Sequence, residues 1–335
     1  MKNTIAGLSA KIQAHKKLAM GILLAVILVL PILMNTNYFR SILIRVLLYA
    51  LLASSLNIIN GYTGQFNIGH AGLYAIGCYT AGILSTRFGW SFWVLLPVSG
   101  IVTAFFGYLI SIPTRKLSGI YLGLVTLGFS EIIRLVCLNW TALTGGAMGI
   151  KNIPRPMLFG LKIKSTLQFY YIILILLIIS VLVMRRVINS RVGRAWIAIR
   201  EDNTAARFLA VNTGRYKSVN FAFGAFFAGI AGCFSAYYYQ YIASDMFSVD
   251  QGFDILAMVI IGGQGTLIGP MLGAVIVTII TEAFRFAAEY RLVVYAILII
   301  TMMWIRPQGI AGDPDSIFAI KGRKKKRRRI RLERK

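Results

Sequence analysis

Residues 168–184 read QFYYIILILLIISVLVM, and this stretch decides the class of fold because it contains no charged side chain. Its length approaches the roughly 20 residues with which a helix crosses the hydrocarbon core of a bilayer. Arg185 and Arg186 follow directly, so the apolar run ends in a basic loop. We therefore expect a membrane-spanning helix here.

Apolar runs of similar length occupy most of the remaining chain. They cover residues 18–34, 42–59, 66–86, 92–112, 119–138, 218–240, 267–284 and 290–305. Of the 335 residues, 57% are hydrophobic and 14% are charged, whereas a soluble domain carries roughly 25% charged residues. The sequence therefore predicts an all-α, polytopic transmembrane helical bundle and argues strongly against a soluble enzyme.

Charged residues between the runs predict the orientation, since cytoplasmic loops of membrane proteins are enriched in Lys and Arg. Residues 1–17 carry four lysines and residues 185–217 carry eight Lys or Arg, so both segments are expected in the cytoplasm. Residues 241–254 carry three aspartates and no Lys or Arg, and are expected outside. Residues 139–167 are expected outside as well, although they hold four basic residues.

Parity then gives the expected number of crossings. Residues 321–335 contain 11 Lys or Arg and one acid, so the chain is expected to end in the cytoplasm. From the outside at residue 254, the chain needs an odd number of crossings to end in the cytoplasm. Only two long runs follow residue 264, so the short apolar stretch 254–264 is expected to cross as well. A re-entrant loop at 254–264 would leave the tail outside. The prediction is about ten crossings. They form one domain, residues 18–306, between a cytoplasmic N-terminal segment, 1–17, and a cytoplasmic basic tail, 307–335.

The first run, 18–34, is interpreted as a retained span rather than a signal peptide, because it is long and no small-residue cleavage site follows it.

The basic tail is expected to bind anionic lipid head groups after the last span. Binding of nucleic acid by such a tail would be electrostatic and without sequence preference. No specific nucleic-acid partner is therefore expected.

Three glycine-rich segments interrupt the apolar runs, at residues 60–72, 144–149 and 262–273. Irregular backbone at membrane depth is tolerated only where protein or water satisfies its polar groups. The first segment is either a gating element or a tight turn between helices, and the second is an external entrance or a plain turn. The third repeats the Gly-Gln pair of the first, which chance explains best. Candidate residues of a substrate path are Asn57, Tyr62, Gln65, Asn67, His70, Thr144, Gly145 and Gly146.

Charged side chains within apolar runs are costly and therefore informative. Glu131 and Arg134 lie three residues apart, so they share a helix face and are expected to form a structural ion pair. A contact of this pair with solute is the alternative. Arg45 and Glu282 lie close enough to helix ends for their side chains to extend toward the membrane surface, so neither is nominated as a functional residue.

The sequence contains no residue pattern typical of nucleotide binding, metal binding or catalysis. A phosphate-binding loop of the Walker A type needs Gly-Lys followed by Ser or Thr, and the chain contains no Gly-Lys pair. The two histidines and three scattered cysteines match no usual metal site. We expect no cofactor on this chain and disfavour a membrane enzyme; if the protein pumps, its ATPase is a separate chain.

Residues 190–214 predict two short cytoplasmic helices. Asp202 or Asn203 can cap the second helix, and Gly214 suits the position after its end, where φ is often positive. Ala205, Phe208 and Leu209 form a short apolar ridge. Such a helix can insert into the groove of a partner protein, or alternatively lie on anionic lipid.

Six short stretches of the sequence, taken together in their order along the chain, resemble the LivM-type permease subunit of branched-chain amino-acid ABC importers. The resemblance spans residues 50–311 and rests on residues 61–71, 118–132, 139–149, 193–206, 262–266 and 307–309. The family often has glycine where Ala210 stands here. The basic tail is not part of the family pattern.

The resemblance implies a bacterial inner-membrane importer in which two permease subunits form the path for leucine, isoleucine and valine. Two cytoplasmic ATPase subunits would use ATP and Mg, and an external binding protein would deliver the solute. Urea or another small polar solute is the alternative cargo, and a secondary carrier or channel is the alternative mechanism. The implied ATPase-coupling residues, within the loop 185–217, are Gly193, Arg194, Ala195, Arg200, Glu201, Asp202, Ala205, Ala206, Phe208 and Leu209.

Overall fold

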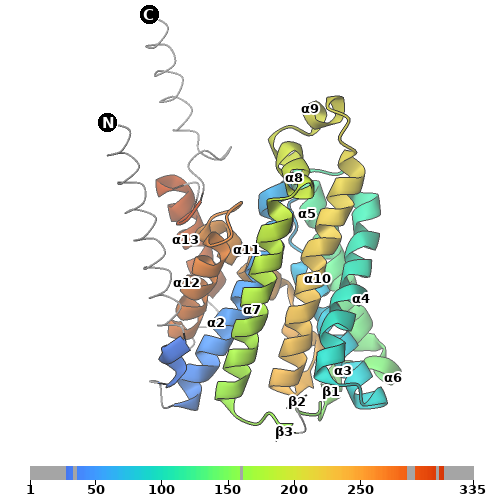
Figure 1. Cartoon of the computed structure of the whole chain (residues 1–335), viewed down its shortest axis with the longest axis vertical. Helices are drawn as coiled ribbons and strands as arrows, with labels where there is room; N and C mark the ends of the chain where they lie inside the picture. Colours follow the sequence, from blue (N-terminus) through green and yellow to red (C-terminus); the bar gives the residue numbers. More distant parts are fainter. Residues whose placement is uncertain (1–27, 33–35, 159–160, 285–290, 307–308, 313–335) are drawn as a thin grey trace, which may run out of the picture.

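A computed structural model of the chain describes residues 28–32, 36–158, 161–284, 291–306 and 309–312. Most of these residues lie in helices, and the long helices run roughly along one direction (Figure 1). The predicted N-terminal segment 1–17, most of the first expected span and most of the basic tail 307–335 lie outside the described residues.

The helices follow one another with short connections. They are α2 (Asn37–Asn57), η1 (Ile58–Tyr62), α3 (His70–Phe88), α4 (Phe92–Thr114), α5 (Gly119–Asn139), α6 (Thr141–Thr144), η2 (Gly146–Met148), α7 (Thr166–Ile188), α8 (Arg191–Glu201), α9 (Asn203–Phe208), α10 (Thr213–Tyr239), η3 (Ser244–Phe247), α11 (Val249–Gly262), α12 (Gly269–Ala283) and α13 (Arg291–Ile305). The strands are β1 (Ile150–Lys151), β2 (Met157–Leu158), β3 (Leu161–Lys162) and β4 (Tyr241–Ile242). The expected all-α fold thus holds apart from these two-residue strands.

Five helical segments among the described residues are long and apolar enough to cross a membrane. They are α2 together with η1, α4, α5, α7 and α10. The central helix α11 has 14 residues, and α12 and α13 have 15 each. A helix of 15 residues is only about 22 Å long, shorter than the hydrocarbon core. The structure supports an α-helical membrane protein, and the number of crossings stays a prediction.

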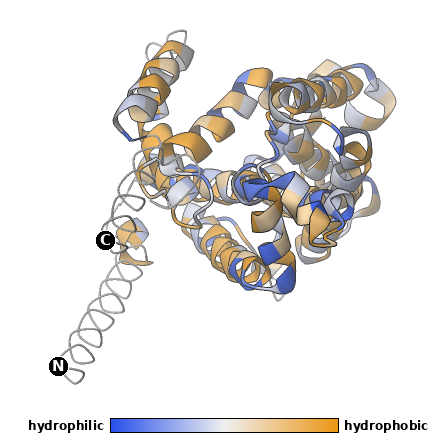
Figure 2. Cartoon of the chain, turned by 90° about the horizontal axis from the view of Figure 1, so that it is seen from above, coloured by the Kyte–Doolittle hydropathy of each residue, from blue (hydrophilic) through white to orange (hydrophobic). Residues whose placement is uncertain are grey.

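The core forms around α10, which packs closely on α3 and α4 because small residues line the contacts. A Cβ atom added to Gly77 of α3 would lie 2.6 Å from the Cα of Gly229, and one added to Gly229 would lie 2.5 Å from the carbonyl oxygen of Ser99. Small residues let helix backbones approach in this way in membrane proteins. Figure 2 shows apolar colouring on outward faces of the bundle as well as between helices, as a lipid-exposed protein requires.

The two ends of the bundle differ. At one end, which we call the β end, β1 pairs antiparallel with β4 and places Ile150 opposite Ile242, while β2 pairs with β3. At the other end, which we call the α8 end, α8 and α9 project beyond the long helices (Figure 1). The β1–β4 pairing brings residues 139–167 and 241–247 together, in agreement with their expected location on one side of the membrane.

Candidate functional site

The first glycine-rich segment is a buried break in the helical structure near the α8 end. The π-helical turn η1 ends α2, extended backbone follows, and α3 begins only at His70 rather than near residue 66 as the hydropathy predicted. The cause lies on α5, where the hydroxyl of Thr126 accepts hydrogen bonds from the amides of Ile68 (3.1 Å) and Gly69 (3.4 Å). These amides are therefore satisfied outside any helix.

Polar side chains satisfy the rest of this irregular backbone. The Asn60 side-chain amide pairs with the backbone of Asn67 in both directions, at 3.1 and 3.3 Å. The Gln65 side chain donates to the carbonyl of Lys217 (3.2 Å) and to Oδ1 of Asn220 (3.3 Å) on α10. Polar backbone inside an apolar bundle requires such partners, so the segment is a built element and more than a simple turn.

His70 begins α3 and is fully buried. Its Nε2 lies 2.7 Å from the hydroxyl of Ser55, which itself donates to the carbonyl of Leu52 at 2.7 Å. The network therefore assigns the ring proton to Nε2. Tyr62 and Asn67 are buried as well. In this conformation these predicted path residues lie inside the chain, and their contact with solute stays a prediction.

Asn57 joins the first break to the third. Its side-chain nitrogen donates to the carbonyl of Thr266 at 2.7 Å, and its Oδ1 accepts from the amide of Gly265 at 2.9 Å. A Cβ on Gly61 would overlap both the Asn57 Oδ1 and the Gly265 nitrogen. The two Gly-Gln pairs, 64–65 and 263–264, were attributed to chance in the sequence. The turns that contain them pack against each other.

The chain after α13 completes this region. The amides of Ile310 and Ala311 donate to the carbonyls of Ile261 and Gly262 at 3.0 and 2.9 Å. These are carbonyls of the last turn of α11, which have no partner within the helix itself. The Pro-Gln-Gly motif of the sequence therefore precedes a segment that closes the end of α11. We call Gly61–Gly64, Gly262–Thr266 and Gly309–Ala311 together the glycine junction.

Helices α8 and α9 form as expected, next to the glycine junction. Trp196 is fully buried and donates to the carbonyl of Tyr216 at 3.0 Å, which fixes α8 on α10. Of the two predicted caps, Asp202 is the one that caps α9, because its Oδ1 accepts from the amides of Thr204 and Ala205 at 2.8 and 3.0 Å. This cap satisfies two amides of the first turn of α9 and so stabilises the short helix.

The predicted coupling residues divide into buried and exposed groups. Phe208 and Leu209 are 87% and 77% exposed, so two adjacent apolar residues lie uncovered at the end of α9. Gly193 and Ala206 face the interior and are not available to a partner while α8 and α9 stay in place. The exposed or half-exposed members are Arg194, Ala195, Arg200, Glu201, Asp202, Ala205, Phe208 and Leu209.

The expectation for Gly214 was wrong, and Ala210 takes its role. Gly214 lies in the first turn of α10, whereas Ala210, just after α9, has the positive φ of 59°. The sequence offered a signal, since the family often has glycine at the position of Ala210. Left-handed backbone is reached by glycine without the steric cost that other residues carry.

We therefore expect Ala210→Gly to leave the melting temperature unchanged or raise it, and Ala210→Val to lower it. The left-handed conformation costs a residue with a Cβ roughly 1 kcal/mol, and β-branching adds to this cost. Thermal unfolding of the purified chain in detergent tests both variants. Equal melting temperatures for Ala210→Val and the unchanged chain would show that this turn carries no strain.

The second glycine-rich segment is a hydrogen-bonded turn at the β end. The hydroxyl of Thr144 donates a hydrogen bond to the carbonyl of Cys137 at 2.6 Å and accepts one from the amide of Gly146 at 3.3 Å. The segment lies near the far end of α3, whose 19 residues separate it from His70 by roughly 28 Å. The structure therefore splits the predicted path residues into two groups at opposite ends and does not bring Thr144, Gly145 and Gly146 to the others.

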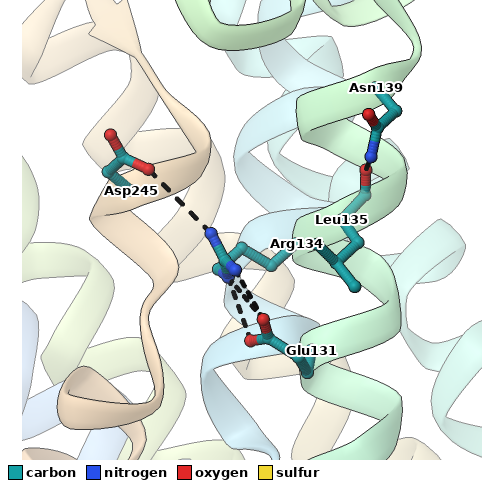
Figure 3. Close-up of polar contacts among 5 residues, drawn as sticks. All are labelled: Glu131, Arg134, Leu135, Asn139 and Asp245. Atoms are coloured by element: carbon teal, nitrogen blue, oxygen red, sulfur yellow. Dashed lines mark hydrogen bonds and ion pairs between the residues drawn. The ribbon is translucent and has the colours of Figure 1, made fainter.

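The predicted ion pair of α5 is confirmed. Arg134 Nε lies 2.9 and 3.0 Å from the two carboxylate oxygens of Glu131, and Nη1 lies 4.0 Å from Oδ1 of Asp245, which precedes α11 (Figure 3). The side chains of Arg134 and Glu131 are 23% and 32% exposed. Asp245 was not among the predicted partners, since over 100 residues of sequence separate it from α5.

Arg45 and Glu282 form an ion pair that was not predicted from the sequence. Arg45 Nη1 lies 3.0 Å from Oε2 of Glu282, and the hydroxyl of Tyr38 donates to the same carboxylate. The pair links α2 to α12 and neutralises two charges that would each be costly beside lipid. Hydropathy alone gives no indication of which helices pack together.

These features define a class: an α-helical integral membrane protein whose helices are interrupted by buried polar segments, as in transport proteins. The chain matches the family described as branched-chain amino acid transport system, permease component, over residues 38–303. It therefore belongs to this family.

Three relatives illustrate the match. The chain is 35% identical over 287 residues to the high-affinity branched-chain amino acid transport system permease protein LivM of Escherichia coli strain K12, covering 79% of this chain and 68% of the relative. It is 36% identical over 287 residues, with the same coverage, to LivM of Salmonella typhimurium. It is 27% identical over 298 residues to the permease protein LivH of Escherichia coli strain K12, covering 80% of this chain and 92% of the relative. No solved structure matches the chain.

Proposed function

We propose that this chain is a transmembrane permease subunit of an ATP-driven importer that carries leucine, isoleucine and valine across a bacterial inner membrane. The family match and the names of the relatives support the transport of branched-chain amino acids. The single structural observation that carries the ATP-driven mechanism is the exposed pair Phe208 and Leu209 at the end of the capped helix α9, outside the bundle. In a carrier acting alone, the same surface would instead lie on anionic lipid.

In this proposal the α8 end faces the cytoplasm, together with both termini, and the chain crosses the membrane about ten times. Residues 18–306 form the permease domain, and its loop 185–217 receives two ATPase subunits that use ATP and Mg. The basic residues of this loop support the orientation. The β end, with Thr144–Gly149, faces an external binding protein. The polar residues of the first break border the solute path when the helices rearrange, and the basic tail contacts anionic lipid head groups.

The outward face of α5 supports a second permease subunit as a further partner. Among the five candidate spans, α5 is the least buried, and its Ile120, Tyr121 and Ile132 are 74%, 74% and 60% exposed. The same helix carries the partly exposed Glu131–Arg134 pair, which is costly beside lipid and cheaper against protein or water. We therefore propose that the second permease covers α5 and that the path runs between the two subunits.

Gentle solubilisation of the tagged, full-length chain from its native membrane, followed by identification of copurifying proteins, tests the proposed assembly. We expect two ATPase chains and a second permease in fixed ratio to this chain. Recovery of the chain alone, still able to transport solute in vesicles without ATP, would favour a secondary carrier and would contradict the proposal.

A further inference from the structure

Arg200 is the one coupling-loop side chain that reaches into the glycine junction in the described residues. It lies in the last turn of α8, and its Nη1 donates to the carbonyl of Gly61 within η1 at 2.7 Å. The side chain is only 15% exposed. The carbonyls at the end of a helix lack intrahelical partners and carry partial negative charge, so a guanidinium is well suited to this position.

Glycines on two separate segments make room for this side chain. A Cβ on Gly64 would lie 3.2 Å from Cγ of Arg200, and one on Gly265 would lie 2.5 Å from its Nη1. Both glycines have positive φ, 71° and 79°. The guanidinium therefore lies between the first and third breaks, at the point where Asn57 also joins them.

Three elements thus meet at one charged group: the end of α8, the π-helical end of α2, and the turn that connects α11 to α12. The Glu201 carboxylate, 3.2 Å from Nη2, is half-exposed and holds the other side of the guanidinium. A displacement of α8 along the bundle has to move Gly61 and Gly265 with it, or it breaks the hydrogen bond from Arg200 to the carbonyl of Gly61. Trp196 joins α8 to α10, and α8 also packs against α7 and α9, but none of these contacts reaches the glycine junction.

We infer that Arg200 is a positioning residue that transmits movement of α8 to the two broken helices. This inference rests on the proposed function, in which an ATPase subunit contacts α9 and shifts α8. In the conformation described here the guanidinium holds the α8-side ends of the first and third breaks together. Opening of the path at this end requires the Arg200–Gly61 bond to lengthen or rearrange.

The test uses the complete importer with its partner chains, reconstituted in vesicles, and the variants Arg200→Gln and Arg200→Lys. Arg191→Gln is the matched control, because it removes the same charge from an exposed position of the same helix. We expect Arg200→Gln to assemble with the ATPase subunits in the normal ratio. Stimulation of hydrolysis by the leucine-loaded binding protein should fall roughly tenfold or more, since a charge-assisted hydrogen bond is lost. Arg200→Lys should restore part of it.

Stimulation and uptake within twofold of the unchanged importer in Arg200→Gln would overturn the inference. Loss of the ATPase subunits from this variant would also overturn it, because Arg200 would then serve docking rather than transmission. If Arg200→Gln does not accumulate in the membrane, Gly265→Ala replaces it. The added methyl displaces Nη1 and should likewise reduce stimulation, and normal stimulation would overturn the inference. Failure of the unchanged chain to recover any ATPase would instead refute the proposed function.

Discussion

Replacing Phe208 and Leu209 together with serine is expected to abolish ATP-driven uptake while the chain still inserts and folds. Both side chains are largely exposed and make little contact within the chain, so their loss should change folding stability by less than about 0.5 kcal/mol. In a partner's groove, however, an apolar anchor of this kind contributes roughly 2 kcal/mol or more. Removing two such anchors should weaken the ATPase contact by roughly 1000-fold.

The measurement is the ratio of ATPase to permease after purification, together with the uptake rate in vesicles. Met148→Ser is a matched control, because Met148 is a similarly exposed apolar residue (69%) at the opposite end of the molecule. It should retain the ATPase fully. A Phe208→Ser/Leu209→Ser variant that keeps both ATPase subunits and normal uptake would show that α9 is not the docking element.

Replacing Gly69 with alanine is expected to prevent normal accumulation of the chain. The added Cβ would overlap the backbone carbonyl of Thr126, which cannot turn away because it belongs to α5. Overpacking of a tight contact costs roughly 1–3 kcal/mol and sometimes more. The shift also breaks the hydrogen bonds from Ile68 and Gly69 to the Thr126 hydroxyl. The checks are the amount of chain in the membrane and the melting temperature in detergent.

Gly214→Ala provides the control for this variant. The nearest atom to its added Cβ is Cδ of Arg115 at 3.6 Å, an ordinary van der Waals distance. The residue lies in a regular helical turn, where alanine is favoured over glycine. We expect no loss of stability from Gly214→Ala. If Gly69→Ala behaves the same way, the tight approach of the first break to α5 does not exist in the membrane.

Hydropathy predicted the long helices because their boundaries depend on local composition. The run at residues 168–184 lies within α7, and the run at 218–240 corresponds closely to α10. The start of α3 was misplaced because the apolar run was taken to begin at residue 66, whereas the amides of Ile68 and Gly69 bond to Thr126 on another helix. A hydroxyl more than 50 residues away cannot be read from the local pattern.

The site was predicted in its residue types and missed in its contacts. Asn57 and Arg200 were both singled out, yet no sequence pattern indicated that they meet at the same pair of glycine-rich turns. The bonds involved join residues 139 and 208 positions apart. The Arg45–Glu282 pair, 237 positions apart, escaped prediction for the same reason. Pairing across such distances follows from helix packing, which a single sequence does not specify.

Uptake of labelled leucine into vesicles that contain this chain with its copurified partners tests the proposed function most directly. We expect uptake to require both ATP on the ATPase side and the external binding protein, and we expect isoleucine and valine to compete with leucine whereas urea does not. Uptake of leucine by the chain without ATP or ATPase subunits would contradict the proposed function.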